Sequence, residues 1–166
     1  MAEITMGGNP MKTNGELPAV GSKAPDFTVT KDDMADVSLS DYAGKRVILS
    51  LFPSLDTPTC AQSVRSFNER ASSLGDTVVL NVSADLPFAM KRFCGAEGIE
   101  NVEVGSTFRN PETLSNYGVA FAAGPLVGLS ARAVVVIEED GTVLHSQLVP
   151  ELANEPDYDA AIAALS

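Results

Sequence analysis

Residues 47–74, VILSLFPSLDTPTCAQSVRSFNERASSL, predict a strand, a short loop and a helix in succession. The apolar run at residues 47–52 has the length and the β-branched content of a buried strand. Pro53 ends this strand, and a short polar loop follows it. Apolar residues then recur at spacings of three and four, as on one face of a helix: Val64, Phe67, Ala71 and Leu74.

The start of this helix is well marked. Thr57 is a residue type that caps helix N-termini, and Pro58 suits the first helical position. Cys60 therefore falls in the first turn, near unpaired backbone N–H groups and the positive end of the helix dipole. Both features favour the thiolate, which is the form that attacks electrophiles. A free cysteine is more often a small buried hydrophobic residue, and position alone leaves both interpretations open.

The residues around Cys60 add a resemblance. Pro53, Thr57 and Cys60 form the pattern Pro-x-x-x-Thr-x-x-Cys, which resembles the peroxidatic loop of the peroxiredoxins. Three later stretches and the C-terminal PDYDAAIAAL look like the thiol peroxidase branch of that superfamily: DLPFAMKRFCGAEGIENV at 85–102, FRNPETLSNYGVAF at 108–121 and GPLVGLSARAVVVI at 124–137. The resemblance covers nearly the whole chain.

Composition sets broad limits on partners and location. The 166 residues suit one domain with a proper core, and 11 basic against 22 acidic residues give a net charge of −11. This balance argues against a nucleic-acid or anionic-membrane surface, which needs clustered Lys and Arg. No apolar run reaches the ~18–20 residues of a membrane span, and no signal peptide is evident. We therefore expect a cytoplasmic protein, and the resemblance implies a bacterial one. Two cysteines in a reducing cytosol are typically catalytic or redox-sensing.

The second half of the predicted βαβ unit is an apolar strand at residues 77–82. One helix between two strands implies parallel pairing with a right-handed crossover. A second helix is predicted from Leu86 to Cys94, with Gly95 as its C-terminal stop, so that Cys94 ends the helix. A short strand in residues 102–108 and a short helix at 111–117, stopped by Gly118, complete this region.

The remaining segments complete a thioredoxin-type pattern. Asn14-Gly15 is a turn signal for an N-terminal hairpin, which the resemblance also supports. A short strand at 27–29 and a helical turn at 38–44 precede the opening strand. Two strands at 133–138 and 142–149 flank Asp140-Gly141, and a helix at 156–165 ends the chain. We predict a single domain, residues 1–166, with a thioredoxin-like α/β sandwich: a central mixed sheet flanked by helices, with an N-terminal β-hairpin.

Hydroperoxide reduction, which the resemblance implies, requires a site that keeps a sulfur deprotonated, orients the O–O bond and stabilises the leaving oxygen. Cys60 supplies the nucleophile, and Thr57 supplies a hydroxyl that can donate and accept hydrogen bonds. Pro53 shields the sulfur from water. Arg132 on its own is most simply a surface residue at a strand edge, but its Ala-Arg-Ala-Val-Val-Val context matches the family's active-site arginine. Arg65 is a weaker second candidate, because it lies five residues after Cys60 and also suits a solvated helix face.

Cys94 is the only other cysteine in the chain. The resemblance implies that it resolves the Cys60 sulfenic acid as an intrachain disulfide, which thioredoxin then reduces. That disulfide closes a loop of about 35 residues, worth ~3–4 kcal/mol in the chain-entropy model. On separate helices, the Cα atoms of the two cysteines are expected to lie more than ~7 Å apart, so both helical turns must unwind during turnover. A buried structural thiol is the alternative for Cys94.

No cofactor or metal is expected. One histidine, His145, and two distant cysteines make a poor zinc set, and His145 receives no catalytic role. There is no Cys-x-x-Cys, which disfavours thioredoxin's own dithiol exchange. A set of apolar residues could line an entrance for alkyl hydroperoxides or could belong to the core: Phe52, Phe88, Phe93, Phe121 and Leu126.

The sequence favours an antioxidant thiol peroxidase that acts on hydrogen peroxide and organic hydroperoxides. Two alternatives stay open, namely a redox sensor whose oxidation alters a binding surface and a structural module with inert cysteines. The family resemblance alone implies a homodimer, and the sequence leaves the preferred hydroperoxide undetermined.

Overall fold

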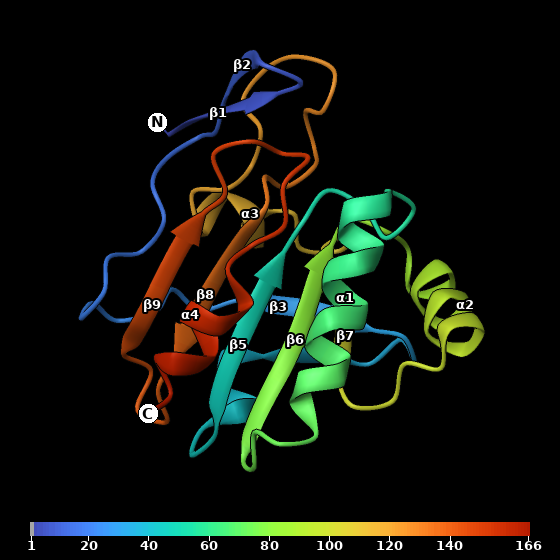
Figure 1. Cartoon of the computed structure of the whole chain (residues 1–166), viewed down its shortest axis with the longest axis vertical. Coiled ribbons are helices and arrows are strands. Elements are labelled where there is room, and N and C mark those ends of the chain that lie inside the picture. Colours follow the sequence, from blue (N-terminus) through green and yellow to red (C-terminus); the bar gives the residue numbers. More distant parts are fainter. Residues whose placement is uncertain (1) are drawn as a thin grey trace.

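The computed structural model describes residues 2–166 and contains a mixed seven-stranded sheet with a separate two-stranded hairpin (Figure 1). The strands of the large sheet lie in the order β4-β3-β7-β6-β5-β8-β9. Their bounds, with the two hairpin strands first, are β1 Glu3–Met6, β2 Asn9–Lys12, β3 Thr28–Lys31, β4 Asp36–Ser38, β5 Arg46–Leu51, β6 Thr77–Ser83, β7 Glu103–Ser106, β8 Ala133–Ile137 and β9 Val143–Leu148. The helices are η1 Leu39–Tyr42, α1 Pro58–Ala71, α2 Pro87–Glu97, α3 Glu112–Asn116 and α4 Tyr158–Ala163.

The predicted βαβ unit is present as β5-α1-β6. The two strands pair in parallel, from Arg46 opposite Thr77 to Leu51 opposite Val82. On the other side of β5, β8 runs antiparallel, and β9 follows it through the turn at Asp140-Gly141. A thioredoxin-like fold with a mixed central sheet, helices on its faces and an N-terminal hairpin is therefore confirmed.

Alternation along the central strands places apolar side chains on both faces of the sheet. Val47, Leu49 and Leu51 point from β5 into the larger core cluster, whereas Ile48 faces the opposite side and packs with Phe67 of α1. Strands buried on both faces read as continuous apolar runs, which explains why the predicted strands were recognisable. Figure 1 shows α1 and α4 in front of the sheet and α3 behind it.

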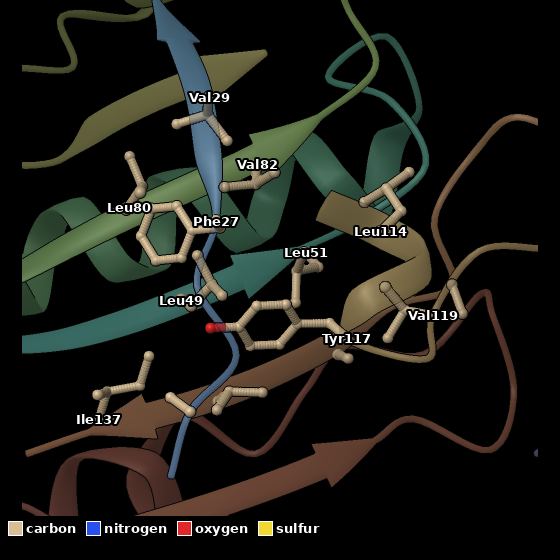
Figure 2. Packing of buried hydrophobic residues seen from close by; sticks show 14 of the residues in the cluster. Phe27, Val29, Leu49, Leu51, Leu80, Val82, Leu114, Tyr117, Val119 and Ile137 are labelled. Carbon is tan, nitrogen blue, oxygen red and sulfur yellow. The ribbon is translucent and has the colours of Figure 1, made fainter. Parts of the chain in front are cut away.

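The larger core cluster lies on the α3 side of the sheet. Tyr117 is fully buried at its centre, with Phe27, Leu49 and Leu51 around it (Figure 2). The Tyr117 hydroxyl donates to the carbonyl oxygen of Pro25 at 2.6 Å, so its one polar atom is satisfied. Each fully buried large apolar side chain contributes about 1.5–3 kcal/mol, which makes this cluster the main support of the sheet.

The N-terminal hairpin is present, but its turn is not where the sequence predicts it. The turn lies at Gly7 and Gly8, whose φ angles of 57° and 84° suit a tight two-residue hairpin turn. Asn14 instead fastens the segment after the hairpin, because its side chain donates to the Ser115 carbonyl and accepts from the Ala120 N–H. Two turn signals lie close together here, and contact with the α3 region decides which one forms the hairpin.

The predicted end of α2 is also wrong. The helix runs past Gly95 and ends at Gly98, which has a left-handed φ of 64° and donates its N–H to the Cys94 carbonyl. Ile99 bonds the same carbonyl at 2.9 Å and buries its side chain, an arrangement typical of helix C-termini. Cys94 consequently lies within the last turns of α2. The short edge strand β4 was not predicted.

None of the helices within residues 2–166 is both long and apolar enough to span a membrane.

Candidate active site

Cys60 lies in the first turn of α1 and is completely buried. Pro58 occupies the start of the helix and Thr57 the N-cap position, with the extended backbone that a cap requires. Val64 and Phe67 continue the buried face of α1, so packing against the sheet fixes where the Cys60 sulfur points. The sequence-based placement of Cys60 in the first helical turn is confirmed.

Arg132 reaches this sulfur from another part of the fold. It directly precedes β8, and its Nη1 lies 3.3 Å from the Cys60 Sγ. Its Nε and Nη2 both donate to the carbonyl oxygen of Leu152, at 3.1 and 2.8 Å. Only 3% of Arg132 is exposed. The expectation from the isolated residue, a strand-edge surface arginine, is therefore wrong.

The burial of Arg132 bears directly on the charge state of the sulfur. Within residues 2–166, no ion pair joins Arg132 to a carboxylate, and a buried cation needs a compensating negative charge. The Cys60 Sγ, at 3.3 Å from Nη1, is the nearest group that could carry one. Arginine stays charged under all ordinary conditions, so the Cys60 sulfur always lies beside a cation.

The Thr57 hydroxyl does not cap α1. It donates to the carbonyl oxygen of Ser54 at 2.9 Å, and no side-chain cap bond forms. A hydroxyl that donates once still has lone pairs for accepting a hydrogen bond. The loop therefore orients the Thr57 hydroxyl, whose oxygen can accept a hydrogen bond from a donor such as a hydroperoxide O–H.

A pocket of about 330 Å³ adjoins these residues. Pro53, Thr57 and Arg132 line it, and most of its remaining wall is apolar: Met6, Leu126, Leu129, Leu152 and Ala153 contribute. Of the aromatic and aliphatic residues suggested as an entrance, only Leu126 lines this pocket. Phe52 and Phe121 are core residues, and Phe88 is largely exposed.

Asp85 holds the loop between β5 and α1 and was missed by the sequence analysis. Its carboxylate accepts from the Ser54 hydroxyl at 2.7 Å, from the Leu55 N–H at 2.8 Å and from the Ser83 hydroxyl at 2.6 Å. Ser54 in turn orients Thr57. A single aspartate after a strand carries no distinctive sequence signal, because its three donors become neighbours only when β5 and β6 pair.

Comparison with known proteins identifies the family. The redoxin family model matches residues 19–162. Thiol peroxidases of Mycobacterium tuberculosis and Mycobacterium bovis are 58% identical over 165 residues, which cover 99% of this chain and 99% of theirs. The chain belongs to the thiol peroxidase branch of the redoxin family. It is accordingly a peroxiredoxin-type oxidoreductase, which uses a hydroperoxide substrate and a thiol reductant.

Solved structures agree with this assignment. A peroxiredoxin-like protein from Aquifex aeolicus is 37% identical, with a TM-score of 0.94 over 99% of this chain and 96% of that one. A thiol peroxidase from Chromobacterium violaceum has a TM-score of 0.90 over 98% and 94% of the two chains. At 21% identity the second likeness shows the fold alone.

The second cysteine of this thiol peroxidase lies on α2. Cys94 and Cys60 are both free thiols, and both pack into one apolar cluster between α1 and α2, together with Val64 and Met90. Burial, together with a smaller contribution from the charge of Asp32, raises the pKa of the Cys94 thiol to about 11. Cys94 is therefore protonated at neutral pH in this conformation.

The other candidates lie outside the site. Arg65 pairs with Glu97 of α2 at 2.5 Å on the protein surface and has no contact with Cys60. His145 is half-buried on β9, and its Nε2 has no hydrogen-bond partner among the described residues. Across residues 2–166, no group of three or more His, Cys, Asp or Glu side chains could hold a metal ion.

Proposed function

We propose that this thiol peroxidase reduces hydrogen peroxide and organic hydroperoxides at Cys60, with Cys94 as the resolving thiol. The observation that carries the proposal is the 3.3 Å contact between Arg132 Nη1 and the buried Cys60 Sγ. A cation fixed beside a thiol at a helix N-terminus favours the thiolate, and the adjoining apolar pocket is open to an alkyl group.

The first step transfers one oxygen atom. The Cys60 thiolate attacks one peroxide oxygen, an S–O bond forms and the O–O bond breaks. The other oxygen leaves with the bonding electron pair and takes up a proton, giving water or an alcohol. Cys60 becomes a sulfenic acid and is oxidised by two electrons. Arg132 and Thr57 are placed to bind the two oxygens, and Pro53 limits access of water.

The second step forms a disulfide. The Cys94 sulfur attacks the Cys60 sulfur, an S–S bond forms and the S–O bond of the sulfenic acid breaks. The hydroxyl takes up the proton that the Cys94 thiol gives up and leaves as water. The two cysteines lie on separate helices, and Cys94 is held in its neutral form by burial. These facts support a local unwinding of α2 and the first turn of α1, which frees Cys94 and brings the sulfurs together.

The catalytic cycle closes when a dithiol donates two electrons. We propose thioredoxin as that reductant, a homodimer as the working form and a bacterial cytoplasm as the location. The family membership supports these three statements. Sedimentation velocity tests the dimer, since a single species at the monomer mass at micromolar concentration contradicts it.

The decisive experiment is steady-state consumption of cumene hydroperoxide with thioredoxin, thioredoxin reductase and NADPH. The parent should turn over many times and Cys60→Ser not at all. Cys94→Ser should complete one turnover and stop as a sulfenic acid, detected by a dimedone adduct and mass spectrometry. Normal cycling of Cys94→Ser with thioredoxin refutes the resolving role. An inactive parent refutes the enzyme and favours the redox-sensor or inert-module alternative.

A further inference from the structure

Glu151 occupies an unusual position between the N-terminal hairpin and the segment after β9. Its carboxylate accepts four hydrogen bonds that join these two parts. Three come from the hairpin: the Thr5 hydroxyl at 3.0 Å, the Gly8 N–H at 3.0 Å and the Gly7 N–H at 3.3 Å. The fourth comes from the Ala153 N–H at 3.0 Å. One carboxylate therefore fixes the geometry of both segments.

The residue between Glu151 and Ala153 is Leu152, whose carbonyl aims Arg132. That oxygen receives both Nε and Nη2 of the guanidinium, which leaves Nη1 directed at the Cys60 sulfur. The Leu152 N–H is itself bonded to the Thr5 carbonyl at 2.8 Å. The position of the Leu152 carbonyl is thus fixed by the hydrogen bond between Glu151 and Ala153 on either side of it, and by the bond from Leu152 to the hairpin.

We propose that Glu151 is a positioning residue for peroxide reduction, which fastens the hairpin to residues 150–153 and thereby holds the Leu152 carbonyl that directs Arg132 at Cys60. The inference rests on the proposed role of Cys60. Glu151 touches neither the sulfur nor the pocket, so its effect passes through Arg132.

Two further observations agree with this role. The N–H groups of Ala153 and Gly8 lower the pKa of Glu151 to about 2, so the carboxylate is charged throughout the neutral range. The Thr59 hydroxyl, in the first turn of α1, donates to the Ala153 carbonyl at 2.9 Å. This contact also holds residues 150–153 in place, and so helps to keep the Leu152 carbonyl directed at Arg132.

The test uses the full chain with Glu151→Gln and Thr5→Val. Glutamine keeps the size of the side chain but loses the charge and one acceptor, and valine removes one hairpin donor. The second-order rate constant of Cys60 oxidation is measured by stopped flow with cumene hydroperoxide in the Cys94→Ser background. We expect Glu151→Gln to lower it between about tenfold and about a hundredfold, the range that a small misplacement of a catalytic group produces. Thr5→Val should lower it less.

Glu100→Gln is the matched control, because it removes the same charge from an exposed site. A merely structural role predicts that Glu151→Gln lowers the melting temperature but leaves the Cys60 oxidation rate within twofold of the parent, and that result overturns the proposal. A double-mutant cycle adds a second criterion. Because Glu151 acts through Arg132, Glu151→Gln should have little further effect in an Arg132→Ala background, and full additivity also overturns it.

If Glu151→Gln does not fold, Thr5→Val decides alone, and an unchanged oxidation rate in that folded variant contradicts the proposal. If the parent does not react with hydroperoxide, the proposed function fails before Glu151 is tested. The two failures are therefore distinguishable.

Discussion

The surroundings of the Cys60 sulfur depend on contacts made by single side chains. Three nitrogens of Arg132 are committed, two to the Leu152 carbonyl and one to the Cys60 sulfur. A guanidinium can satisfy both partners at once because its donors form a rigid planar fork. A lysine ammonium is a point charge on a flexible stem and cannot hold both in fixed directions.

We therefore expect Arg132→Lys to lower the second-order rate constant of Cys60 oxidation by about a hundredfold, the usual loss when one preorganised donor is removed from a site of developing charge. Stopped-flow measurement with hydrogen peroxide tests this. Arg92→Lys, at an arginine that is 72% exposed, is the control and should retain the parent rate. A rate within threefold of the parent in Arg132→Lys shows that positive charge alone suffices.

Among the elements, the loop between β5 and α1 and the helix α2 lie at the centre of the proposed cycle. Asp85 precedes α2 and holds the loop that carries Ser54 and Leu55. The loop before Cys60 is therefore anchored by a residue that lies just before the helix of Cys94.

Asp85→Asn should loosen this loop, because hydrogen bonds to a charged acceptor contribute about 1.5–3 kcal/mol each. We expect faster amide hydrogen exchange in residues 54–60, measured by mass spectrometry of the reduced protein, with the exchange of β8 unchanged. The control is Asp56→Asn, since Asp56 is exposed and its only ion pair within residues 2–166 is a 3.7 Å contact with Arg92. Equal exchange in both variants contradicts the anchoring role of Asp85.

The reactivity of Cys94 on α2 should depend on pH. The pKa of Cys94 is raised to about 11 by burial first and by the charge of Asp32 second, so its thiolate fraction in the folded protein is small at pH 9 and reaches one half only near pH 11. In the Cys60→Ser variant, the alkylation rate of Cys94 by iodoacetamide should keep rising well beyond pH 9. In 6 M guanidinium, the alkylation rate should be half-maximal near pH ~8.5, the pKa of a free thiol. A plateau by pH 9 in the folded protein refutes the prediction.

For the whole molecule, the N-terminal segment packs closely against the α3 region, and this contact should contribute to stability. Gly118 has a left-handed φ of 71°, and a Cβ there would lie 2.1 Å from the Glu16 carbonyl oxygen. Gly98, at the end of α2, has a similar φ of 64° but open space around it. The two glycines share a backbone requirement and differ only in crowding.

This pair gives a matched comparison. Gly98→Ala should lower the free energy of unfolding by about 1–2 kcal/mol, the cost of a left-handed alanine. Gly118→Ala should add about 1–3 kcal/mol more, because the methyl group overlaps backbone that cannot move away cheaply. Urea unfolding followed by circular dichroism measures both. Equal losses of unfolding free energy in the two variants would mean that the N-terminal segment moves away from residue 118 at no cost.

Local patterns in the sequence determined much of the fold. The apolar run at residues 47–52, the Pro58 start of the helix and the apolar spacing from Val64 to Ala71 predicted β5 and α1 correctly. Their success has a simple cause, since strand and helix periodicity depends on residues a few positions apart. The N-terminal hairpin turn and the end of α2 failed for the complementary reason. Each segment offers two glycine-containing signals, and packing chooses between them.

The site could be predicted from the sequence only in part. The position of Cys60 in the first turn of a helix followed from the sequence. Arg132 and Cys94 were singled out only through the resemblance to the family. The contact between Arg132 and Cys60 spans 72 positions, and the Leu152 carbonyl that aims the guanidinium lies 20 positions from Arg132. No pattern in the sequence predicted that the carboxylates of Asp85 and Glu151 hold these loops.

The sequence by itself determined most of the helices and strands, their order along the chain and the helical turn that bears the Cys60 thiol. Only the tertiary structure decided which cation meets the Cys60 sulfur, which carbonyl directs it and which carboxylates hold the surrounding loops. The physical reason is that helix and strand formation depend on short-range spacing along the chain. Hydrogen bonds between a side chain and a distant backbone group exist only after the paired strands and the hairpin have brought those groups within about 3 Å of each other.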